Sequence, residues 1–408
     1  MNDYDVIVVG GGMVGASFAS ALSSLPLSIA IVEAHPPEAP GQPSYDDRST
    51  ALSNGSRRIL ESIGLWSLMH DDATPILSIH VSDRGRPGFA RIDHREEGVD
   101  ALGHVVVNRR LGAALTGFID RCDNVALFAP ARVVEMENQG DVIELLLSGS
   151  ADNEIRRIRA PLLVAADGVR SQIREWAGIQ VTEWDYGQTA IVTNVTPQRP
   201  HRGTAFERFT DDGALAVLPL GTDRCGIVWT GPHALSEERL ALDNPAFVDA
   251  LQSTFGYRLG NFTRVGKRFS YPLQLVRADE QIRSRVVILG NAAHGLHPIA
   301  GQGFNLALRD AATLAEVIAD AMQEGQDFGT LDVLSRYARW RASDQRRTVA
   351  FTDGLIRTFT NPLFPVRVLR NAGMLALDLV PGAKRVFARY TMGMAGRLPR
   401  LARGVPLI

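Results

Sequence analysis

The sequence feature that most constrains the fold is the glycine-rich stretch YDVIVVGGGMVGASFASAL at the N-terminus. Its four consecutive β-branched apolar residues, 6–9, are typical of a buried parallel strand. Gly10, Gly12 and Gly15 follow with the spacing G-x-G-x-x-G, which permits a tight turn, close approach to a pyrophosphate and close helix packing. The helix expected over 13–23 would direct its N-terminal N–H groups at the phosphates. The motif predicts a dinucleotide site but does not separate FAD from NAD.

A second apolar segment, LSIAIVE, supports this interpretation. It predicts a strand that ends at Glu33, 18 residues after Gly15, where dinucleotide-binding domains place an acid. A carboxylate there accepts hydrogen bonds from ribose hydroxyls and repels a 2′-phosphate. The motif therefore fits a ligand site better than a glycine-rich turn that binds nothing.

Two later segments repeat the order of strand, sharp turn and helix. In RAPLLVAADGVRSQIREWAG, residues 162–166 are expected to form a buried strand that ends at Asp167. Gly178 is expected to close the helix that follows. Taken alone, this segment also fits an ordinary turn in which the aspartate caps the helix.

The third segment, VVILGNAAHGLHPIAGQGFNLALRDA, begins with an expected strand over 286–289. Gly290 allows close backbone approach, and Asn291 projects from the strand end, where α/β sheets bind ligands. Pro298 restricts the loop that follows. Consecutive N–H groups at the next helix start suit an anion or a carbonyl oxygen. The residues that present them are Gly301, Gln302 and Gly303.

These three segments, in this order, resemble the FAD-dependent aromatic hydroxylases of the para-hydroxybenzoate hydroxylase fold. The family combines an N-terminal G-x-G-x-x-G, a D-G pair near the middle of the sequence and a late G-D-x-x-H-x-x-x-P-x-x-G-Q-G-x-N. The matching residues are Gly10, Gly12, Gly15, Asp167, Gly168, Gly290, Asn291, His294, Pro298, Gly301, Gln302, Gly303 and Asn305. The resemblance covers nearly the whole chain and implies FAD as cofactor, with NAD(P)H as co-substrate.

Within that family the chain looks like the ubiquinone-biosynthesis hydroxylases. The segments YDDRSTALSNGSRRILESIGLW and GHVVVNRRLGAAL carry this likeness, which implies cofactor contacts from Arg48 and from Asn108 or Arg109. Asn291 replaces the usual acid of the G-D motif, as in the 2-polyprenyl-6-methoxyphenol hydroxylase branch. An amide can still hydrogen-bond a ribityl hydroxyl without burying a charge, so we expect FAD binding to be kept.

The resemblance implies a monooxygenase that hydroxylates a polyprenylated phenol through a flavin C4a-hydroperoxide, using NAD(P)H and O₂. Alternatives are a sibling hydroxylase acting at another ring position, a hydroxylase of a soluble phenol, a flavin reductase of the same fold and a non-enzymatic scaffold. No residue is identified as a catalytic acid or base. We expect no metal site, because His294 and His297 have no third ligand nearby.

The predicted fold class is α/β: a Rossmann-like FAD-binding domain, an inserted antiparallel-sheet substrate domain and a helical C-terminal region. Because the motifs lie toward both ends of the chain, the FAD-binding domain must be discontinuous. Its predicted ranges are 1–75, 100–180 and 280–350. Short strand patterns assign 76–99 and 181–279 to the substrate domain, and 351–408 remain for the helical region.

Composition excludes several other classes. A net charge of −2 over 408 residues gives no bias toward nucleic acid. Cys122 and Cys225 are too few for a disulfide framework and fit a reducing cytoplasm. Asp3 and Asp5 stand where a signal peptide needs basic residues, and no apolar run of the length of a membrane span occurs.

The C-terminal segment from residue 355 onward is strongly basic. It has one acid, Asp378, so it carries +8, whereas the rest of the chain carries −10. Its basic residues are Arg357, Arg367, Arg370, Lys384, Arg385, Arg389, Arg397, Arg400 and Arg403. Apolar residues lie between them, which suits an anionic membrane surface, a docking surface for other ubiquinone-biosynthesis proteins, or packing on the FAD-binding domain. We expect a cytoplasmic protein, with contact to the inner membrane through this segment as one alternative.

Overall fold

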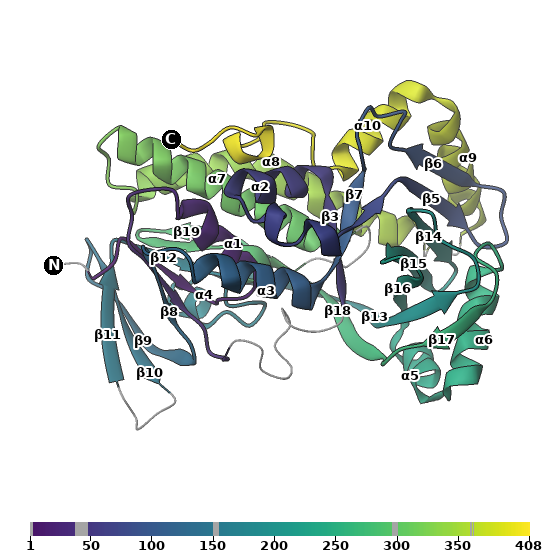
Figure 1. The fold of residues 1–408 in the computed structure, drawn as a ribbon, viewed down its shortest axis with the longest axis horizontal. Coiled ribbons are helices and arrows are strands. Elements are labelled where there is room, and N and C mark those ends of the chain that lie inside the picture. Colours follow the sequence, from purple (N-terminus) through teal and green to yellow (C-terminus); the bar gives the residue numbers. More distant parts are fainter. Residues whose placement is uncertain (1–2, 37–47, 150–154, 296–300, 360, 362) are drawn as a thin grey trace.

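The computed structural model describes residues 3–36, 48–149, 155–295, 301–359, 361 and 363–408. Figure 1 shows an elongated molecule with one sheet toward the N-terminal end, a larger sheet at the opposite end and long helices running between them. The phosphate-loop segments belong to the first sheet, and the segments expected to form the substrate side belong to the second.

The first sheet is parallel except at one edge. In spatial order its strands are β19 (Ile282–Arg283), β20 (Val286–Ile288), β12 (Leu162–Ala165), β1 (Val6–Val9), β2 (Ile29–Val32) and β8 (Val125–Phe128). Only the β19–β20 pairing is antiparallel among these described strands. Val6 and Val8 face one hydrophobic core and Ile7 and Val9 face another, which is why all four are buried.

Helices cover one face of this sheet, and a small antiparallel sheet covers the other. The helices are α1 (Met13–Leu22), α2 (Asn54–Ile63), α3 (Asn108–Ile119), α7 (Gln302–Gln323) and α8 (Leu331–Phe359). The small sheet has the order β11 (Ile155–Ala160), β10 (Ile143–Gly149) and β9 (Ala131–Asn138). The short helix α4 (Gln172–Trp176) follows β12.

The second, larger sheet forms the other end of the molecule. Its order is β21 (His294–Gly295), β18 (Phe269–Ala278), β13 (Val181–Pro197), β16 (Arg224–Pro232), β15 (Gly213–Leu220), β14 (Thr204–Thr210), β5 (Ser78–Asp83) and β6 (Phe89–Asp93), and β17 (Phe262–Val265) also pairs with β13. Another small sheet, β3 (Ser49–Ser53), β7 (Gly103–Val107) and β4 (Thr74–Ile76), lies between the two halves.

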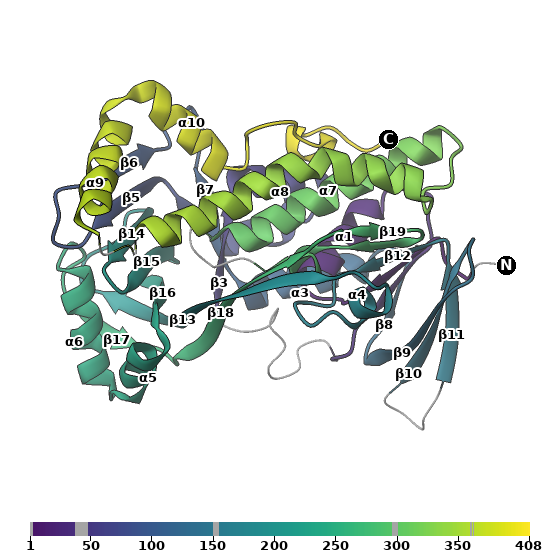
Figure 2. The same ribbon diagram turned by 180° about the vertical axis from the view of Figure 1, so that it is seen from behind.

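Different helices cover the two faces of the larger sheet. Helices α5 (His233–Ala241) and α6 (Asn244–Phe255) pack on one face. The end of α8, together with α9 (Phe364–Leu379) and α10 (Pro381–Thr391), covers the other face (Figure 2). The C-terminal segment then returns to the first half, where Leu401 joins the core beside α2 and α7.

The expected α/β fold class is confirmed. The larger sheet is antiparallel except where β14 pairs in parallel with β5, a pairing between distant segments that the sequence analysis did not predict. Helix α8 passes through residue 350 without a break, so the helical C-terminal region begins inside this helix. The domain boundaries themselves stay a prediction.

One expectation for the basic segment is wrong. Arg370 was counted with the basic surface, but its side chain is 1% exposed and donates to Asp83 over 2.9 Å. Lys384 pairs with Glu96. The basic segment is therefore partly a packing element, and only some of its charges remain at the surface.

Candidate active site

The first phosphate loop is held against the second motif through glycine backbone. Gly10 has φ +98°, and a Cβ there would lie 2.5 Å from the carbonyl oxygen of Ala166, directly before Asp167. A Cβ on Gly15 would lie 1.9 Å from the carbonyl oxygen of Gly10. Neither position can accept a side chain without moving the backbone, so these glycines bring the two motifs together.

The start of α1 suits a diphosphate. Its N-cap, Gly12, offers no side-chain hydrogen bond, and the first turn carries no acid. The first N–H groups of a helix have no partners within the helix, and they carry the positive end of the helix dipole. This end of the helix therefore fits the pyrophosphate of the expected FAD.

Glu33 directly follows β2 and braces the glycine loop. Its carboxylate accepts from the backbone N–H of Gly11 over 2.7 Å and from that of His35 over 2.9 Å. The side chain therefore lies beside the loop, as the sequence predicted. Its contact with a ribose stays a prediction.

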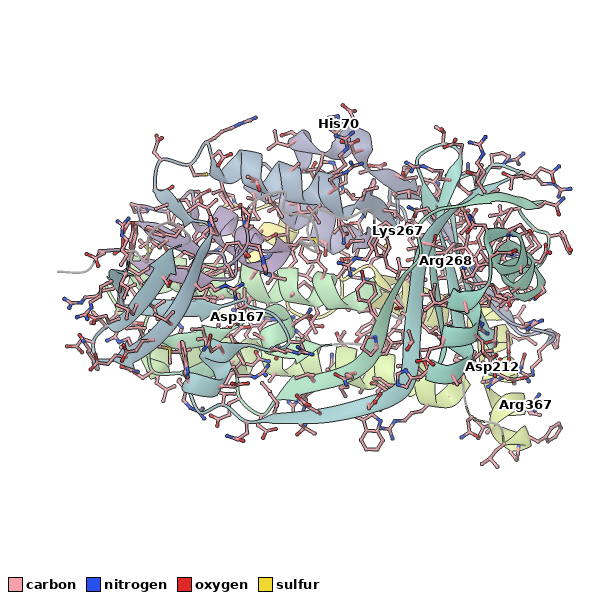
Figure 3. The ribbon with its side chains drawn as sticks, turned by 90° about the horizontal axis from the view of Figure 1, so that it is seen from below. His70, Asp167, Asp212, Lys267, Arg268 and Arg367 are labelled. Atoms are coloured by element: carbon pink, nitrogen blue, oxygen red, sulfur yellow. The ribbon has the colours of Figure 1, made fainter. Side chains whose placement is uncertain are left out.

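Asp167 is a half-buried acid at the turn beside Gly10 (Figure 3). Its Oδ2 accepts from the N–H of Ile173 over 3.4 Å, whereas no described residue hydrogen-bonds its buried Oδ1. Burial raises the pKa of this carboxyl above its ordinary value, against hydrogen bonds from Ser171 and backbone N–H groups that lower it. An unsatisfied acceptor at this point fits a ligand that supplies a donor, such as a hydroxyl of the cofactor.

Arg48 and Asn108 lie side by side. The N–H of Asn108 donates to the carbonyl of Arg48 over 2.7 Å, and the Arg48 guanidinium carbon stands 4.5 Å from the ring centroid of Tyr271. Thr50 donates to the Asn108 side chain over 2.7 Å. Arg109 is exposed at the start of α3 and lines a smaller cavity. Of these three predicted cofactor contacts, Arg48 and Asn108 are therefore the two that the structure joins by a hydrogen bond.

The third motif packs its turn against α1. Gly290 has φ +59°, and a Cβ there would meet Val14 of α1 at 3.1 Å. Asn291 is exposed in the 3₁₀ turn over Gly290–Ala292 that follows β20. The predicted residue Pro298 lies outside the described residues.

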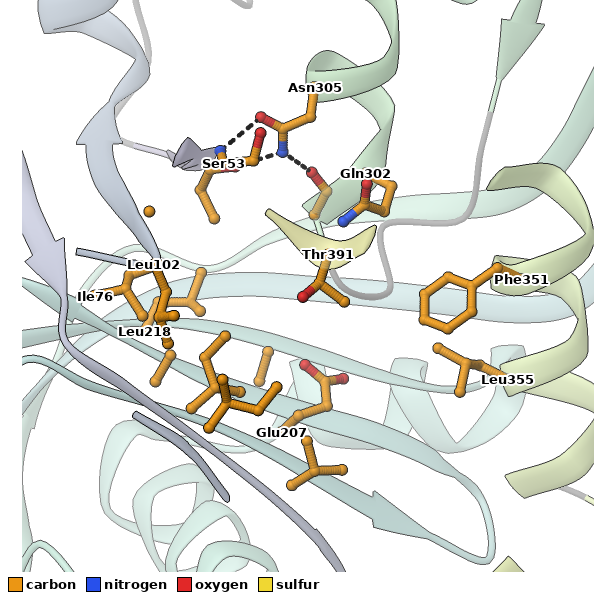
Figure 4. A pocket seen from close by; sticks show the side chains of 18 of the residues that line it. Ser53, Ile76, Leu102, Glu207, Leu218, Gln302, Asn305, Phe351, Leu355 and Thr391 are labelled. Carbon is orange, nitrogen blue, oxygen red and sulfur yellow. Dashed lines mark hydrogen bonds between the residues drawn. The ribbon is translucent and has the colours of Figure 1, made fainter. Parts of the chain in front are cut away.

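Asn305 holds the start of α7 in place. Its side chain donates to the carbonyls of Ala51 and Gly301 and accepts from the N–H of Ser53 over 2.8 Å (Figure 4). Gly301 is the N-cap of α7, with φ +59°, no side-chain cap and no acid in the first turn. Asn305 therefore positions the glycine loop through bonds to the protein, and the start of α7 is open to a carbonyl or an anion.

A cavity of about 610 Å³ begins at this loop. Gly301, Gln302 and Gly303 line it at one end, the larger sheet forms its floor, and α8, α9 and α10 cover it (Figure 4). Most side chains that line it are apolar: Ile76, Ile79, Val81, Ala90, Ile92, Leu102, Ala205, Phe206, Phe209, Leu218, Val228, Phe351, Leu355, Phe359, Met374, Leu377, Phe387 and Met392. Its size and lining suit an aromatic molecule with an apolar substituent.

Residues 3–352 match the family described as FAD binding domain. The chain is 40% identical over 406 residues to ubiquinone hydroxylase UbiL of Rhodospirillum rubrum, covering 99% of this chain and 93% of that protein. It is 30% identical over 396 residues to 3-demethoxyubiquinol 3-hydroxylase of Escherichia coli, covering 96% and 98%. The chain belongs to the ubiquinone hydroxylase family of FAD-dependent aromatic monooxygenases.

A solved structure confirms the fold of this monooxygenase. The p-nitrophenol 4-monooxygenase PnpA from Pseudomonas putida matches with a TM-score of 0.80 at 20% identity, covering 98% of this chain and all of that one. Bound FAD, once reduced by NAD(P)H, would supply the electrons that activate O₂ for ring hydroxylation. The protein's own residues then have to bind the cofactor, orient the substrate and keep water away from the reaction.

A buried ionic network links His294 of β21 to α7 and α8. His294 Nε2 lies 3.1 Å from Asp310, which also bonds Arg341, and Arg341 reaches Asp344 over 2.5 Å. Burial raises the pKa of Asp310, but the charge of Arg341 and the bond from His294 outweigh burial and bring it to about 2. His294 therefore has Asp310 as a structural partner.

Glu207 is a residue of the monooxygenase cavity that the sequence analysis missed. It lies in β14, within TAFERFT, and its carboxyl points into the cavity (Figure 4). The available signal was an acid flanked at alternate positions by Ala205 and Phe209, which places a charge on the apolar face of a strand. Periodicity alone did not reveal that this face borders a cavity.

Proposed function

We propose that this monooxygenase hydroxylates the ring of a polyprenylated phenol, of the 2-polyprenyl-6-methoxyphenol type, in ubiquinone biosynthesis. The observation that carries the proposal is the apolar cavity that runs from the glycine loop of α7 to the helices α8, α9 and α10. A phenol ring would lie near Gln302, with its prenyl group among the apolar side chains farther along. The relatives from Rhodospirillum rubrum and Escherichia coli, both named as ubiquinone-pathway hydroxylases, support the same pathway.

A second candidate is a sibling reaction at another ring position. It is favoured by the relative named 3-demethoxyubiquinol 3-hydroxylase, with which this chain is 30% identical along nearly its whole length. The two candidates differ only in the carbon that receives oxygen. They call for the same cofactor and the same kind of cavity.

The cofactor contacts predicted from the sequence are part of the proposal. Gly10, Gly12 and Gly15 with the start of α1 would hold the pyrophosphate, and Glu33 the ribose. Asp167 and Asn291 would hydrogen-bond hydroxyls along the cofactor. The remaining contacts are assigned to Arg48, Asn108, Arg109, Gly290, Pro298, Gly301, Gln302, Gly303 and Asn305.

The surface of α9 and α10 supports contact with a membrane. Large apolar side chains are exposed there at Leu363, Phe364, Val368, Leu369, Leu379, Val380 and Val386. We call this set the apolar tip; Arg385 and Arg389 are exposed beside it. An apolar surface with basic neighbours suits peripheral contact with an anionic bilayer, from which a prenylated substrate would enter. No described helix is both long and apolar enough to cross a bilayer.

The test is the identity of the quinone-pathway intermediate that accumulates when the gene is deleted, determined by mass spectrometry of the lipid extract. We expect a polyprenylated phenol that lacks oxygen at one ring carbon, and the missing carbon selects between the two candidates. Purified protein with FAD, NAD(P)H and O₂ should convert that intermediate to the hydroxylated product. Normal ubiquinone without any intermediate, and no conversion in vitro, would refute the proposed substrate.

A further inference from the structure

Glu207 occupies the centre of the cavity floor. In the larger sheet it pairs with Val81 of β5 on one side and Ala216 of β15 on the other. The same row continues to Ala90 of β6 and Val228 of β16, and all five residues line the cavity. Four apolar side chains therefore surround one carboxyl group on this face of the sheet.

The carboxyl group of Glu207 has no partner among the described residues. None of them donates a hydrogen bond to it or forms an ion pair with it, and it is the one acid among the described residues of the lining. The one cation among the described residues of the lining, Arg370, bonds Asp83 through Nε and the carbonyls of Thr358 and Phe359 through Nη1. Its buried Nη2 makes no hydrogen bond and lies 3.8 Å from Asp211.

The part of Glu207 that is accessible faces the cavity. Its side chain is half-buried, and it lines the cavity. Burial raises the pKa of Glu207 to about 7. An acid in apolar surroundings with this pKa can accept a proton near neutral pH.

We infer that Glu207 recognises the hydroxyl group of the aromatic substrate, accepting its hydrogen bond and taking its proton during hydroxylation. This inference rests on the proposed function, because it needs a phenol in the cavity. A phenol ring meets apolar side chains on this floor, so its hydroxyl group finds its acceptor at the Glu207 carboxylate. The residue thereby sets which edge of the ring faces the glycine loop of α7.

The proton and electron balance is simple. The phenolic proton moves to Glu207, and the electron pair left on the phenolic oxygen is delocalised to the ring carbon that forms the new C–O bond. That carbon then loses its hydrogen as a proton to solvent, and the C–H electron pair restores the aromatic phenolate. Glu207 returns its proton to the phenolate oxygen and is an ionised carboxylate again. The oxidant is O₂, which reduced FAD would activate: as the C–O bond forms the O–O bond breaks, one oxygen atom enters the ring and the other leaves as water with protons from solvent.

The experiment measures binding without turnover. The oxidised FAD enzyme is titrated with 2-allyl-6-methoxyphenol and with 1-allyl-3-methoxybenzene, which lacks the hydroxyl group, and the flavin absorption is followed without NAD(P)H. At pH 8 the wild-type protein should bind the phenol more tightly than the analogue by roughly 10- to 100-fold, as expected for a hydrogen bond to a charged group. Glu207→Gln should lose most of this ratio.

Two variants serve as matched controls. Glu183→Gln makes the same change at an exposed position of β13 and should keep the wild-type ratio. Thr391→Val removes a hydroxyl group from another part of the cavity lining and should also keep it. In the wild-type protein the ratio should rise as the pH increases through about 7, whereas in Glu207→Gln it should stay constant. Glu207→Ala, which leaves an empty space where Glu207→Gln leaves an amide, should also lose the preference for the phenol.

The outcomes separate this inference from the proposed function. The role of Glu207 is overturned if Glu207→Gln and Glu207→Ala keep the wild-type ratio of affinities for the phenol and its analogue. It is also overturned if only Thr391→Val loses this ratio. If the wild-type enzyme also converts the pathway intermediate, the proposed function still stands. A wild-type protein that binds neither compound and converts no intermediate refutes both.

Discussion

At the residue scale, the carboxyl group of Glu207 has an energetic consequence even without a ligand. Burial raises its pKa from 4.5 to about 7, so the folded protein retains a proton that the unfolded chain releases between these values. The free energy of unfolding must therefore decrease as the pH rises through this window. Because one pKa unit corresponds to about 1.4 kcal/mol, raising the pKa from 4.5 to about 7 costs about 3 kcal/mol above pH 7.

Glu207→Gln removes this ionisation. The ligand-free variant should be more stable than the wild-type protein at pH 8 by about 3 kcal/mol and should differ by less than about 1 kcal/mol at pH 5. Urea unfolding at the two pH values measures the difference, with Glu183→Gln as the control for a change at an exposed site. An equal change in stability at both pH values would contradict the burial of this carboxyl group.

Gly15 should be the least replaceable residue of the phosphate loop. A Cβ there would lie 1.9 Å from the carbonyl oxygen of Gly10. The backbone at Gly10 and at Gly15 cannot move apart without opening the turn. Gly15→Ala is therefore expected to purify without FAD and to lose stability, both measurable by flavin absorption and thermal unfolding. Gly117→Ala is the matched control, because a Cβ in that part of α3 meets no described atom within 4 Å. It should keep FAD and gain up to about 1 kcal/mol.

Gly15 and Glu207 also show which features of the site could be predicted from the sequence and which could not. Gly15 lies in a local motif whose strand, turn and helix are determined by adjacent residues, and the expected bounds of β1 match the structure. The surroundings of Glu207 include Val81 and Ala216, which lie beside it because strands distant in the sequence pair with β14. Its environment depends on tertiary structure, so a single strand pattern could not reveal it.

At the scale of elements, a buried ion pair fastens α9 over the cavity. Arg370 on α9 and Asp83 at the end of β5 are 1% and 0% exposed and lie 2.9 Å apart. Asn371 also donates to Asp83 over 3.1 Å, and its Oδ1 accepts from the N–H of Gly88 over 3.0 Å. The sequence predicted both helical character and basic charge for this segment, but it could not pair residues 287 positions apart.

Breaking this pair should release α9 from the sheet. Arg370→Ala removes a buried charge-assisted hydrogen bond, while Arg86 still pairs with Asp83 over 2.8 Å, so it should cost about 1.5–3 kcal/mol. Asp83→Ala should cost a similar amount, and the double variant less than the sum. Chemical unfolding of all three variants and the wild-type protein gives the coupling energy. Purely additive effects would show that the two side chains do not stabilise each other.

At the scale of the whole molecule, the C-terminal segment joins the two halves. Helices α9 and α10 cover the larger sheet, and the chain then returns so that Leu401 packs beside α2 and α7. This path leaves the apolar tip at the end of the molecule away from the phosphate loop, where Arg367 projects outward (Figure 3). A substrate drawn from a bilayer at the tip would reach the cavity between α8, α9 and α10 without crossing the FAD-binding half.

The apolar tip gives the last prediction. Phe364 is 75% exposed and Leu369 is 70% exposed, so the double variant Phe364→Ser/Leu369→Ser removes two large side chains that have little contact with the protein. Binding to phosphatidylglycerol vesicles in a sedimentation assay should weaken by at least about tenfold, because each buried side chain contributes roughly 1.5–3 kcal/mol. Tyr257→Ser, at a position 67% exposed in the segment between α6 and β17, should bind like the wild-type protein. High salt should weaken the wild-type interaction, since basic residues lie beside the tip. If the tip variant and the Tyr257 variant lose binding equally, the apolar tip is not the membrane contact.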